Sequence, residues 1–137
     1  MKAKELMIGD LVHYIGDDHT NDVNIRVREI HEDFVYSTFA ADEFYYNELE
    51  SIPITPEILG KNGFKKTKRY SYIYKDNYCE VCVSIVPKIK IANIVIGEPH
   101  ENVSINGALF DINMMMTAIH ELQQALRLCG IEKEIIL

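Results

Sequence analysis

The feature that most constrains the fold is a series of short runs in which apolar and polar residues alternate. In the first part of the chain these runs are "LVHYI", "VNIRVREI", "FVYSTF" and "EFYYNELESIPI", separated by polar turns such as "GDDHTND" and "HED". Alternation with a period of two places every second side chain on the same face of a strand. Several such strands with tight turns predict a small antiparallel sheet or an SH3-like barrel.

The middle of the chain changes this pattern. Thr55 suits a helix N-cap, Pro56 suits the first helical position and Gly63 suits the end, so this stretch predicts a short helix. The run "RYSYIYKDNYCEVCVSIV" then predicts a β-hairpin, and "KIKIANIVIG" predicts a further strand.

The C-terminal part predicts one long amphipathic helix, from about Ile112 to Cys129. Asp111 is a good N-cap and Gly130 is a good residue for the turn that ends the helix. The apolar residues between them recur every three or four positions and form one stripe, which consists of Ile112, Met115, Met116, Ile119, Leu122, Leu126 and Cys129.

The fold class that follows is α+β. An N-terminal small antiparallel sheet or SH3-like barrel is followed by a short helix, antiparallel strands and the long C-terminal helix. We expect a small β lobe over residues 1–52 and an α+β lobe over residues 53–137, packed together as one compact unit.

Composition and charge narrow the class of protein. Hydrophobic residues make up 47% and charged residues 26% of the 137 residues, which is typical of a globular chain. The apolar runs are too short to cross a membrane, the N-terminus has no signal-peptide pattern and the three cysteines suit a reducing compartment. These features predict a cytoplasmic protein that does not bind a membrane.

The net charge of −7 is unevenly distributed. Residues 1–60 carry 13 acidic and 4 basic side chains, whereas residues 61–90 carry 2 acidic and 8 basic side chains. The acidic part would repel phosphate groups, which disfavours general binding of nucleic acid. Only the middle segment is suited to an anion.

The stretch "AIHELQQAL" begins like the zinc-protease motif H-E-x-x-H, with His120 and Glu121, but has Gln124 at the second ligand position. An amide binds zinc poorly, so we favour a helix surface over a metal site. On a helix, Ile119, Leu122 and Leu126 share the apolar stripe, and we expect them to face the core. The residues expected to face water or a partner protein are His120, Gln123, Gln124 and Arg127.

Two further motifs have a structural and a functional reading. Cys79 and Cys82 have C-x-x-C spacing but lie in an alternating run, where residues three apart point to opposite faces, so these cysteines and Cys129 are expected to be buried and structural. The run "KKTKRYSYIYK" predicts either a tyrosine face protected by edge lysines or a base-stacking nucleic-acid site. Its residues are Lys65, Lys66, Lys68, Arg69, Tyr70, Tyr72 and Tyr74.

The stretches "LMIGDLVHY", "ESIPITPEILGKNGF" and "IHELQQALRLCGIEKEIIL" together resemble a group of small uncharacterised proteins encoded by gut anaerobic bacteria, their phages and their mobile elements. The similarity in layout covers nearly the whole chain. Members often carry His at the position of Gln124, which implies that this His is replaceable. The resemblance implies a cytoplasmic accessory protein of a phage or mobile element, and implies no activity or cofactor.

These observations predict a non-enzymatic binding or adaptor protein that acts through a protein partner. They assign no catalytic residue, no cofactor and no metal ligand, because no nucleophile, phosphate loop or set of metal ligands has the required pattern. The alternative is a nucleic-acid-binding accessory protein that uses residues 61–75. A metal-dependent enzyme built on His120 is the weakest hypothesis, and the oligomeric state is left open.

Overall fold

The computed structural model of the 137-residue chain describes residues 1–16, 22–75, 79–86, 91–97 and 114–137. It contains two compact units. Unit 1 comprises residues Met1–Pro53 and Ala118–Glu132, and unit 2 comprises Ile54–Thr117 and Lys133–Leu137. The division after Pro53 lies next to the one expected from the sequence, but the C-terminal helix groups with the N-terminal strands and not with the second lobe.

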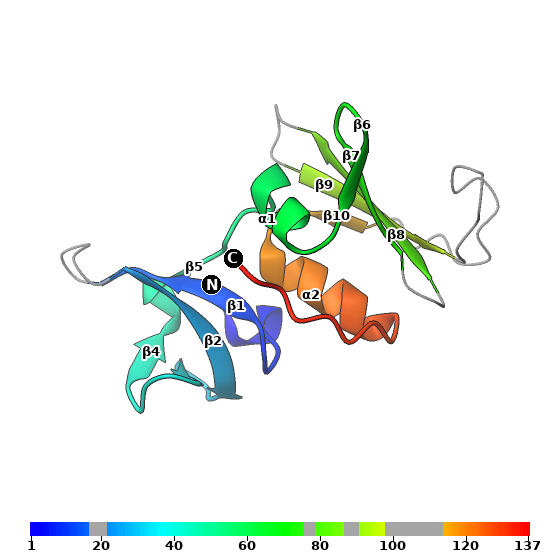
Figure 1. Cartoon of the computed structure of the whole chain (residues 1–137). Coiled ribbons are helices and arrows are strands. Elements are labelled where there is room, and N and C mark those ends of the chain that lie inside the picture. The colour runs from blue at the N-terminus through cyan, green and yellow to red at the C-terminus, as the bar shows by residue number, and fades with distance from the viewer. Residues whose placement is uncertain (17–21, 76–78, 87–90, 98–113) are drawn as a thin grey trace. The chain divides into compact units, whose positions relative to one another are not determined.

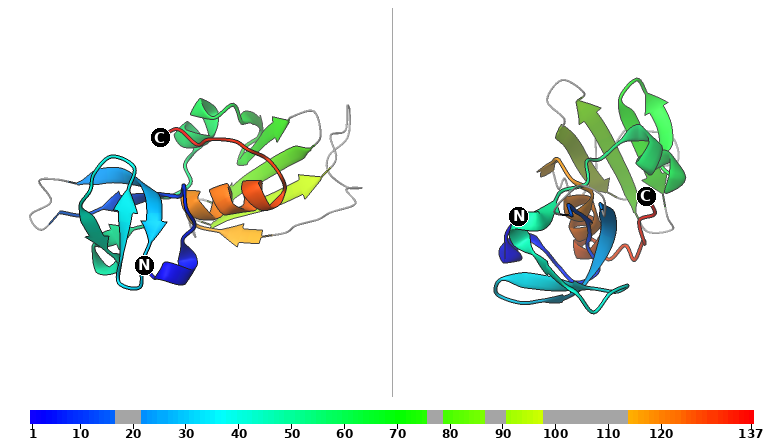
Figure 2. Two further views of the ribbon diagram at one scale, coloured as in Figure 1. Left: turned by 90° about the horizontal axis from the view of Figure 1, so that it is seen from below. Right: turned by 90° about the vertical axis from the view of Figure 1, so that its left-hand side faces the viewer.

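Unit 1 is built on a five-stranded antiparallel sheet in the order β4-β3-β2-β1-β5 (Figure 1). The strands are β1 (Leu11–Tyr14), β2 (Val23–Ile30), β3 (Phe34–Ser37), β4 (Glu43–Tyr45) and β5 (Leu49–Glu50). The strands bend around a common interior, which makes the sheet a curled half-barrel (Figure 2). The stretch expected to be a fourth strand is two short strands, separated by the 3-10 turn Tyr46–Glu48.

Alternation in the sequence explains which side of this sheet is buried. Val12, Ile25, Val27 and Val35 are fully or almost fully buried and pack together with Phe44 on the inner side. Residues between them in the strands, such as those on either side of Val35 and Phe44, point to the other face. A short 3-10 helix, Ala3–Glu5, precedes the first strand.

The C-terminal helix α2 spans Ile119–Leu128 and is shorter than expected. Met114–Met116 form the strand β10, so the helix begins seven residues after the predicted start at Ile112, while Asp111 and Ile112 lie outside the described residues. Pairing of Met114–Met116 with a neighbouring strand outweighs their helical periodicity. The prediction of the end is confirmed, because Cys129 is the C-cap and Gly130 has a φ of +74°, the left-handed conformation that glycine adopts readily.

Glu121 has a structural role at the start of α2. Its carboxylate accepts a hydrogen bond from the backbone N–H of Ala118, the N-cap residue, at 3.0 Å. A glutamate at the third helical position commonly satisfies this otherwise unpaired backbone donor. The Glu of the His-Glu pair therefore helps to set the beginning of the helix.

Unit 2 contains a second antiparallel sheet, in the order β10-β9-β8-β7-β6. Its strands before β10 (Met114–Met116) are β6 (Lys65–Lys68), β7 (Ser71–Lys75), β8 (Glu80–Val86) and β9 (Ile91–Gly97). The predicted short helix is confirmed as α1 (Pro56–Lys61): Thr55 caps it by accepting a hydrogen bond from Ile58 N–H at 3.3 Å. Gly63 follows with a φ of +79°.

The last residues of the chain dock on the end of α1. The buried side chain of Asn62 donates to the carbonyl of Ile136 at 2.7 Å and accepts from its N–H at 2.9 Å. Ile135 is fully buried, whereas Ile136 is exposed. Residues 133–137 are thus a docked tail without regular secondary structure.

The α+β class agrees with these elements at the coarse level of antiparallel sheets with few helices. Neither helix in the described part of the chain is long and apolar enough to span a bilayer.

Candidate functional site

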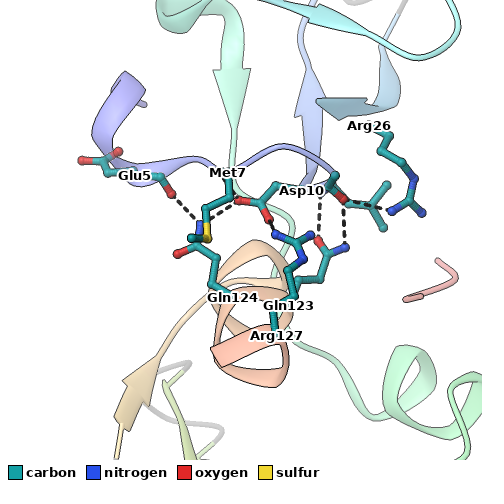
Figure 3. A network of polar contacts seen from close by, with 9 residues as sticks. Glu5, Met7, Asp10, Arg26, Gln123, Gln124 and Arg127 are labelled. Atoms are coloured by element: carbon teal, nitrogen blue, oxygen red, sulfur yellow. Dashed lines mark hydrogen bonds and ion pairs between the residues drawn. The ribbon is translucent and has the colours of Figure 1, made fainter. Parts of the chain in front are cut away.

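The polar side of α2 is occupied by contacts within unit 1 (Figure 3). At their centre is Asp10, whose side chain is 0% exposed. Its carboxylate accepts hydrogen bonds from Met7 N–H at 2.8 Å and Gln124 Nε2 at 2.7 Å, and it forms an ion pair with Arg127 Nη1 at 2.7 Å. Gln124 also donates to the carbonyl of Glu5 at 2.9 Å. Residues 5–10 are therefore fixed to the helix by charge-assisted hydrogen bonds.

Gln123 forms hydrogen bonds with the backbone of Gly9 and Leu11, on either side of Asp10. It is 3% exposed, accepts a hydrogen bond from Leu11 N–H at 2.8 Å and donates to the carbonyl of Gly9 at 3.2 Å. Arg26 donates to the same carbonyl at 3.0 Å. Gly9 has a φ of +89°, and a Cβ atom there would lie 3.2 Å from the Arg127 guanidinium, so the close approach of this loop to α2 favours glycine.

His120 is also buried, with an exposure of 6%. Its Nδ1 has no hydrogen-bond partner within the part of the chain that the structure describes. In the described residues, no group of three or more His, Cys, Asp or Glu side chains could hold a metal ion.

The expectation that His120 and Gln123 face water is therefore wrong. A single covered side along Ile119, Leu122 and Leu126 was expected, and these three residues are indeed buried. The buried arc of the helix is wider than that stripe, because Gln123 pairs with the backbone of Gly9 and Leu11 in the N-terminal segment. Gln124 and Arg127 are partly exposed but have their polar atoms engaged by Asp10. The polar atoms of Gln123, Gln124 and Arg127 are thus engaged within unit 1.

The three cysteines are free thiols and are only partly buried. Burial raises the pKa of the Cys82 thiol and also that of Cys129, so the reactive thiolate is disfavoured at neutral pH. This electrostatic setting is the opposite of that around a catalytic cysteine.

The basic-aromatic segment forms β6, β7 and the turn between them. All four residues of the edge strand β6 are exposed, which includes Lys65, Lys66 and Lys68. With Thr67, Lys65 lines a pocket of about 380 Å³ next to Ile73 and Lys75. The Lys75 ammonium lies 2.5 Å from the carboxylate of the buried Glu80, opposite it on β8, so this charge is already matched by an anion.

The tyrosines of this segment do not form the open stacking platform that the nucleic-acid alternative needs. Tyr72 is 7% exposed and belongs to the core. Tyr74 lies 5.4 Å from the ring of Phe64, and the Lys133 ammonium lies 4.6 Å from its centroid. Tyr70 precedes the strand and has the Arg69 guanidinium 5.2 Å from its ring. A nucleic-acid base would have to stack on these ring faces, but the sheet interior and neighbouring cations already contact them.

A different aromatic cluster lies on the outer side of the sheet of unit 1. We call it the outer aromatic face, and it consists of His31, Phe34, Tyr36 and Tyr45. It arises because β3 and β4 carry aromatic side chains at their outward positions as well as apolar ones inside. The register pairs Phe34 with Tyr45 and Tyr36 with Glu43 across the two strands, so these side chains share one face.

The four rings contact one another. His31 stacks on Phe34 with centroids 4.7 Å apart, and Tyr36 meets both edge-on at 5.3 Å. Tyr45 lies 5.9 Å from Phe34. These are preferred geometries for aromatic pairs, so contacts between the rings themselves stabilise the cluster. Tyr45 is 43% exposed, His31 is exposed and the other two rings are half-buried.

Carboxylates lie beside these rings. Glu43 accepts hydrogen bonds from the hydroxyls of Tyr36 at 3.3 Å and Tyr45 at 2.9 Å. Burial and then the Glu43 charge raise the pKa of Tyr36, and the hydrogen bond to Glu43 raises that of Tyr45. Glu29 lies 3.5 Å from His31 Nε2 and 3.0 Å from Arg28 Nε. The face therefore combines neutral phenols with anionic groups.

Sequence reasoning missed this face because alternation was used only to find the buried side. The signal was present in "FVYS" and "EFYY", where aromatic residues stand at both the inward and the outward positions. Polar residues usually fill the outward positions of a sheet that has one solvated side. Outward rings on two adjacent strands thus indicate a surface that is suited to contact.

No protein-family model, curated protein or solved structure matches the chain. The chemistry of these surfaces is therefore what points to a function.

Proposed function

We propose that this protein is a non-enzymatic binding or adaptor protein that holds a partner protein on the outer aromatic face of unit 1. The observation that carries the proposal is the outward-facing, partly exposed cluster of His31, Phe34, Tyr36 and Tyr45. Protein interfaces are enriched in tyrosine and phenylalanine, and clustered exposed rings on a soluble protein mark contact sites. We further propose that the curled sheet is SH3-like and that the protein acts in the cytoplasm as an accessory factor of a phage or mobile element.

The rings are suited to this role because they are preorganised. A ring that already contacts its neighbours loses little conformational freedom when a partner covers it. Aromatic side chains also bury a large apolar area, so a few of them supply much of the binding energy of an interface. The polar side of α2 is less suitable, since its side chains are already paired with residues 5–11.

The test compares capture of partner proteins from native lysate by the wild type and by two matched variants. Tyr45 and Tyr70 are each 43% exposed and lie in different units, so they lose similar exposed surface on truncation. We expect Tyr45→Ala, alone or with Phe34→Ala, to lose a protein that the wild type and Tyr70→Ala both retain. Capture that ignores Tyr45 and Phe34, or a turnover activity in a substrate screen, would overturn the proposal.

A second candidate function is binding of nucleic acid by the basic segment of unit 2. It is supported by the exposure of Lys65, Lys66 and Lys68 along an edge strand, next to Arg69 and a pocket. Such contacts release counterions, so binding should weaken steeply as salt rises. The absence of an open tyrosine platform in this segment makes it the second choice.

Charge reversal separates the two candidates. Changing Lys65, Lys66, Lys68 and Arg69 to Glu should abolish a gel shift of single-stranded or double-stranded probes, whereas Lys2→Glu with Lys4→Glu should leave it unchanged. A wild-type protein that shifts neither probe at low salt would end this alternative.

A further inference from the structure

We infer that the outer aromatic face of unit 1 binds an arginine-bearing segment of its partner protein. This inference rests on the proposed function and specifies the chemistry of the ligand. Three observations support it: the charge of unit 1, the carboxylates in contact with the rings, and an arginine of the chain itself that already lies on this face.

The charge of unit 1 favours a cationic partner. Its residues include 14 acidic and 5 basic side chains, whereas those of unit 2 include 7 acidic and 9 basic ones. A strongly negative unit attracts cations over distances beyond direct contact and repels phosphate-bearing polymers. A protein segment rich in arginine therefore fits this surface better than a nucleic acid.

Carboxylates meet the rings at the face itself. Glu43 is exposed and fixed by the two tyrosine hydroxyls, which hold its charge at the ends of the rings of Tyr36 and Tyr45. Among the described residues, no basic side chain lies within ion-pair distance of Glu43. Asp33 and Glu48 add negative potential near Tyr45, since both raise its pKa. A cation placed over these rings would gain ring and carboxylate interactions together.

Arg28 shows the proposed mode of contact inside the chain. Its guanidinium lies 5.6 Å from the centroid of Tyr36, while its Nε donates to Glu29 at 3.0 Å. Ring and carboxylate therefore bind the same guanidinium. The pair Tyr45 and Glu43 offers the same combination of groups one strand further along the sheet.

Arginine suits this surface better than lysine. Its planar guanidinium can stack on a ring and donate two hydrogen bonds to one carboxylate, and it is less strongly hydrated than an ammonium group. The Glu43 carboxylate receives one hydrogen bond on each oxygen from the tyrosines, and each oxygen has a further lone pair that can accept.

The experiment is an NMR titration of the full chain with synthetic peptides of repeated Gly-Ser-Arg units. Matched peptides carry citrulline, which has the shape of arginine without its charge, or lysine in its place. We expect the arginine peptide to shift the signals of Phe34, Tyr36 and Tyr45, and to bind about tenfold more tightly than the citrulline peptide, or about 1.4 kcal/mol at 25 °C. The lysine peptide should be intermediate, and salt should weaken both charged peptides.

Two variants localise the effect. Glu43→Gln keeps the shape and removes the charge, so it should weaken arginine binding about three- to tenfold while leaving citrulline binding unchanged. Tyr70→Ala should change nothing. Circular dichroism of each variant confirms that it is folded before it is titrated.

The outcomes distinguish the inference from the proposed function. Equal binding of the arginine and citrulline peptides, or shifts confined to acidic loops away from the rings, would overturn the arginine inference. So would the absence of any shift with the arginine peptide. If partner capture still depended on Tyr45 in that case, the proposed binding function would stand with a different ligand chemistry, and if it did not, both would fail.

Discussion

The polar side of α2 and the outer aromatic face belong to the same unit, yet they are covered to very different degrees. On α2, the amide of Gln123 and the imidazole of His120 are buried. On β3 and β4, the rings of Phe34, Tyr36 and Tyr45 remain half-buried or exposed. Polar groups thus lie inside while aromatic rings lie outside.

The difference shows that unpaired backbone groups can decide what is buried. The segment from Glu5 to Leu11 presents carbonyl and N–H groups that need partners once they are removed from water. Gln123 and Gln124 supply those partners, and burial of Gln123 satisfies both its amide and the backbone of Gly9 and Leu11. The outer side of β3 and β4 has its backbone paired within the sheet, and its rings need no such partner.

The largest expected effect is the loss of stability on truncation of Asp10. Asp10→Ala removes the acceptor of Met7 N–H, Gln124 and Arg127 and should lower the free energy of unfolding by about 2–4 kcal/mol. The value lies below that for a fully enclosed ion pair, because Arg127 is 34% exposed and can turn to water. Urea denaturation followed by circular dichroism measures it. Glu50→Ala, an exposed carboxylate of β5, is the control and should cost less than about 0.5 kcal/mol.

His120 gives the next largest effect and a sharper distinction. His120→Ala should cost about 1–3 kcal/mol because it leaves a cavity, with Leu128→Ala on the exposed side as a near-neutral control. His120→Leu fills the space without a buried ring nitrogen, so it should be at least as stable as the wild type. A thermal melt in which His120→Leu is as damaging as His120→Ala would show that the imidazole nitrogens are needed.

Tyr45→Ala should change stability little, by less than about 1 kcal/mol, and match Tyr70→Ala. The ring is 43% exposed and its loss opens no interior cavity. If chemical denaturation showed a loss close to that of Asp10→Ala, the outer aromatic face would be a structural cluster, and the contrast with α2 would disappear.

The smallest expected effect is on the ionisation of the tyrosines, not on stability. Glu43 raises the pKa of Tyr45 through a hydrogen bond and its charge, and it contributes to the raised pKa of Tyr36. A negative neighbour disfavours the phenolate, so Glu43→Gln should lower both pKa values toward the ordinary range. NMR of the tyrosine ring carbons over an alkaline titration resolves the two residues. Unchanged midpoints would contradict the contact between Glu43 and the rings.

Local patterns predicted much of the secondary structure. The strands of the first sheet, the capped helix after Thr55 and the turn at Gly130 follow from alternation and capping residues. The start of α2 did not follow, because Met114–Met116 fit both a helical stripe and a strand, and pairing with β9 decides between them. An SH3-like barrel remains a proposal beyond the curled sheet.

The candidate site could not be predicted in the same way. The covering of Gln123 depends on residues more than one hundred positions earlier in the chain, and no local rule contains that contact. The outer aromatic face was easier to predict from the sequence, because its rings occupy outward positions on adjacent strands. It becomes apparent only with the strand register, which places these rings on one face. In the segment of β6 and β7, by contrast, Tyr72 is buried in the core.

Unit 1 consists of two stretches that are distant in the sequence. They meet at residues 52–53 and 118–119. Pro53 forms an antiparallel bridge with Ala118, and Ile119 N–H donates to the carbonyl of Ile52 at 2.8 Å. The two ends of residues 54–117 are therefore adjacent. A ribosome must synthesise residues 54–117 before α2 can bind Gly9 and Asp10, so these contacts of unit 1 form late in synthesis. Joining Pro53 to Ala118 through a tight turn would give a chain in which the same contacts form locally, and that shorter loop should fold faster.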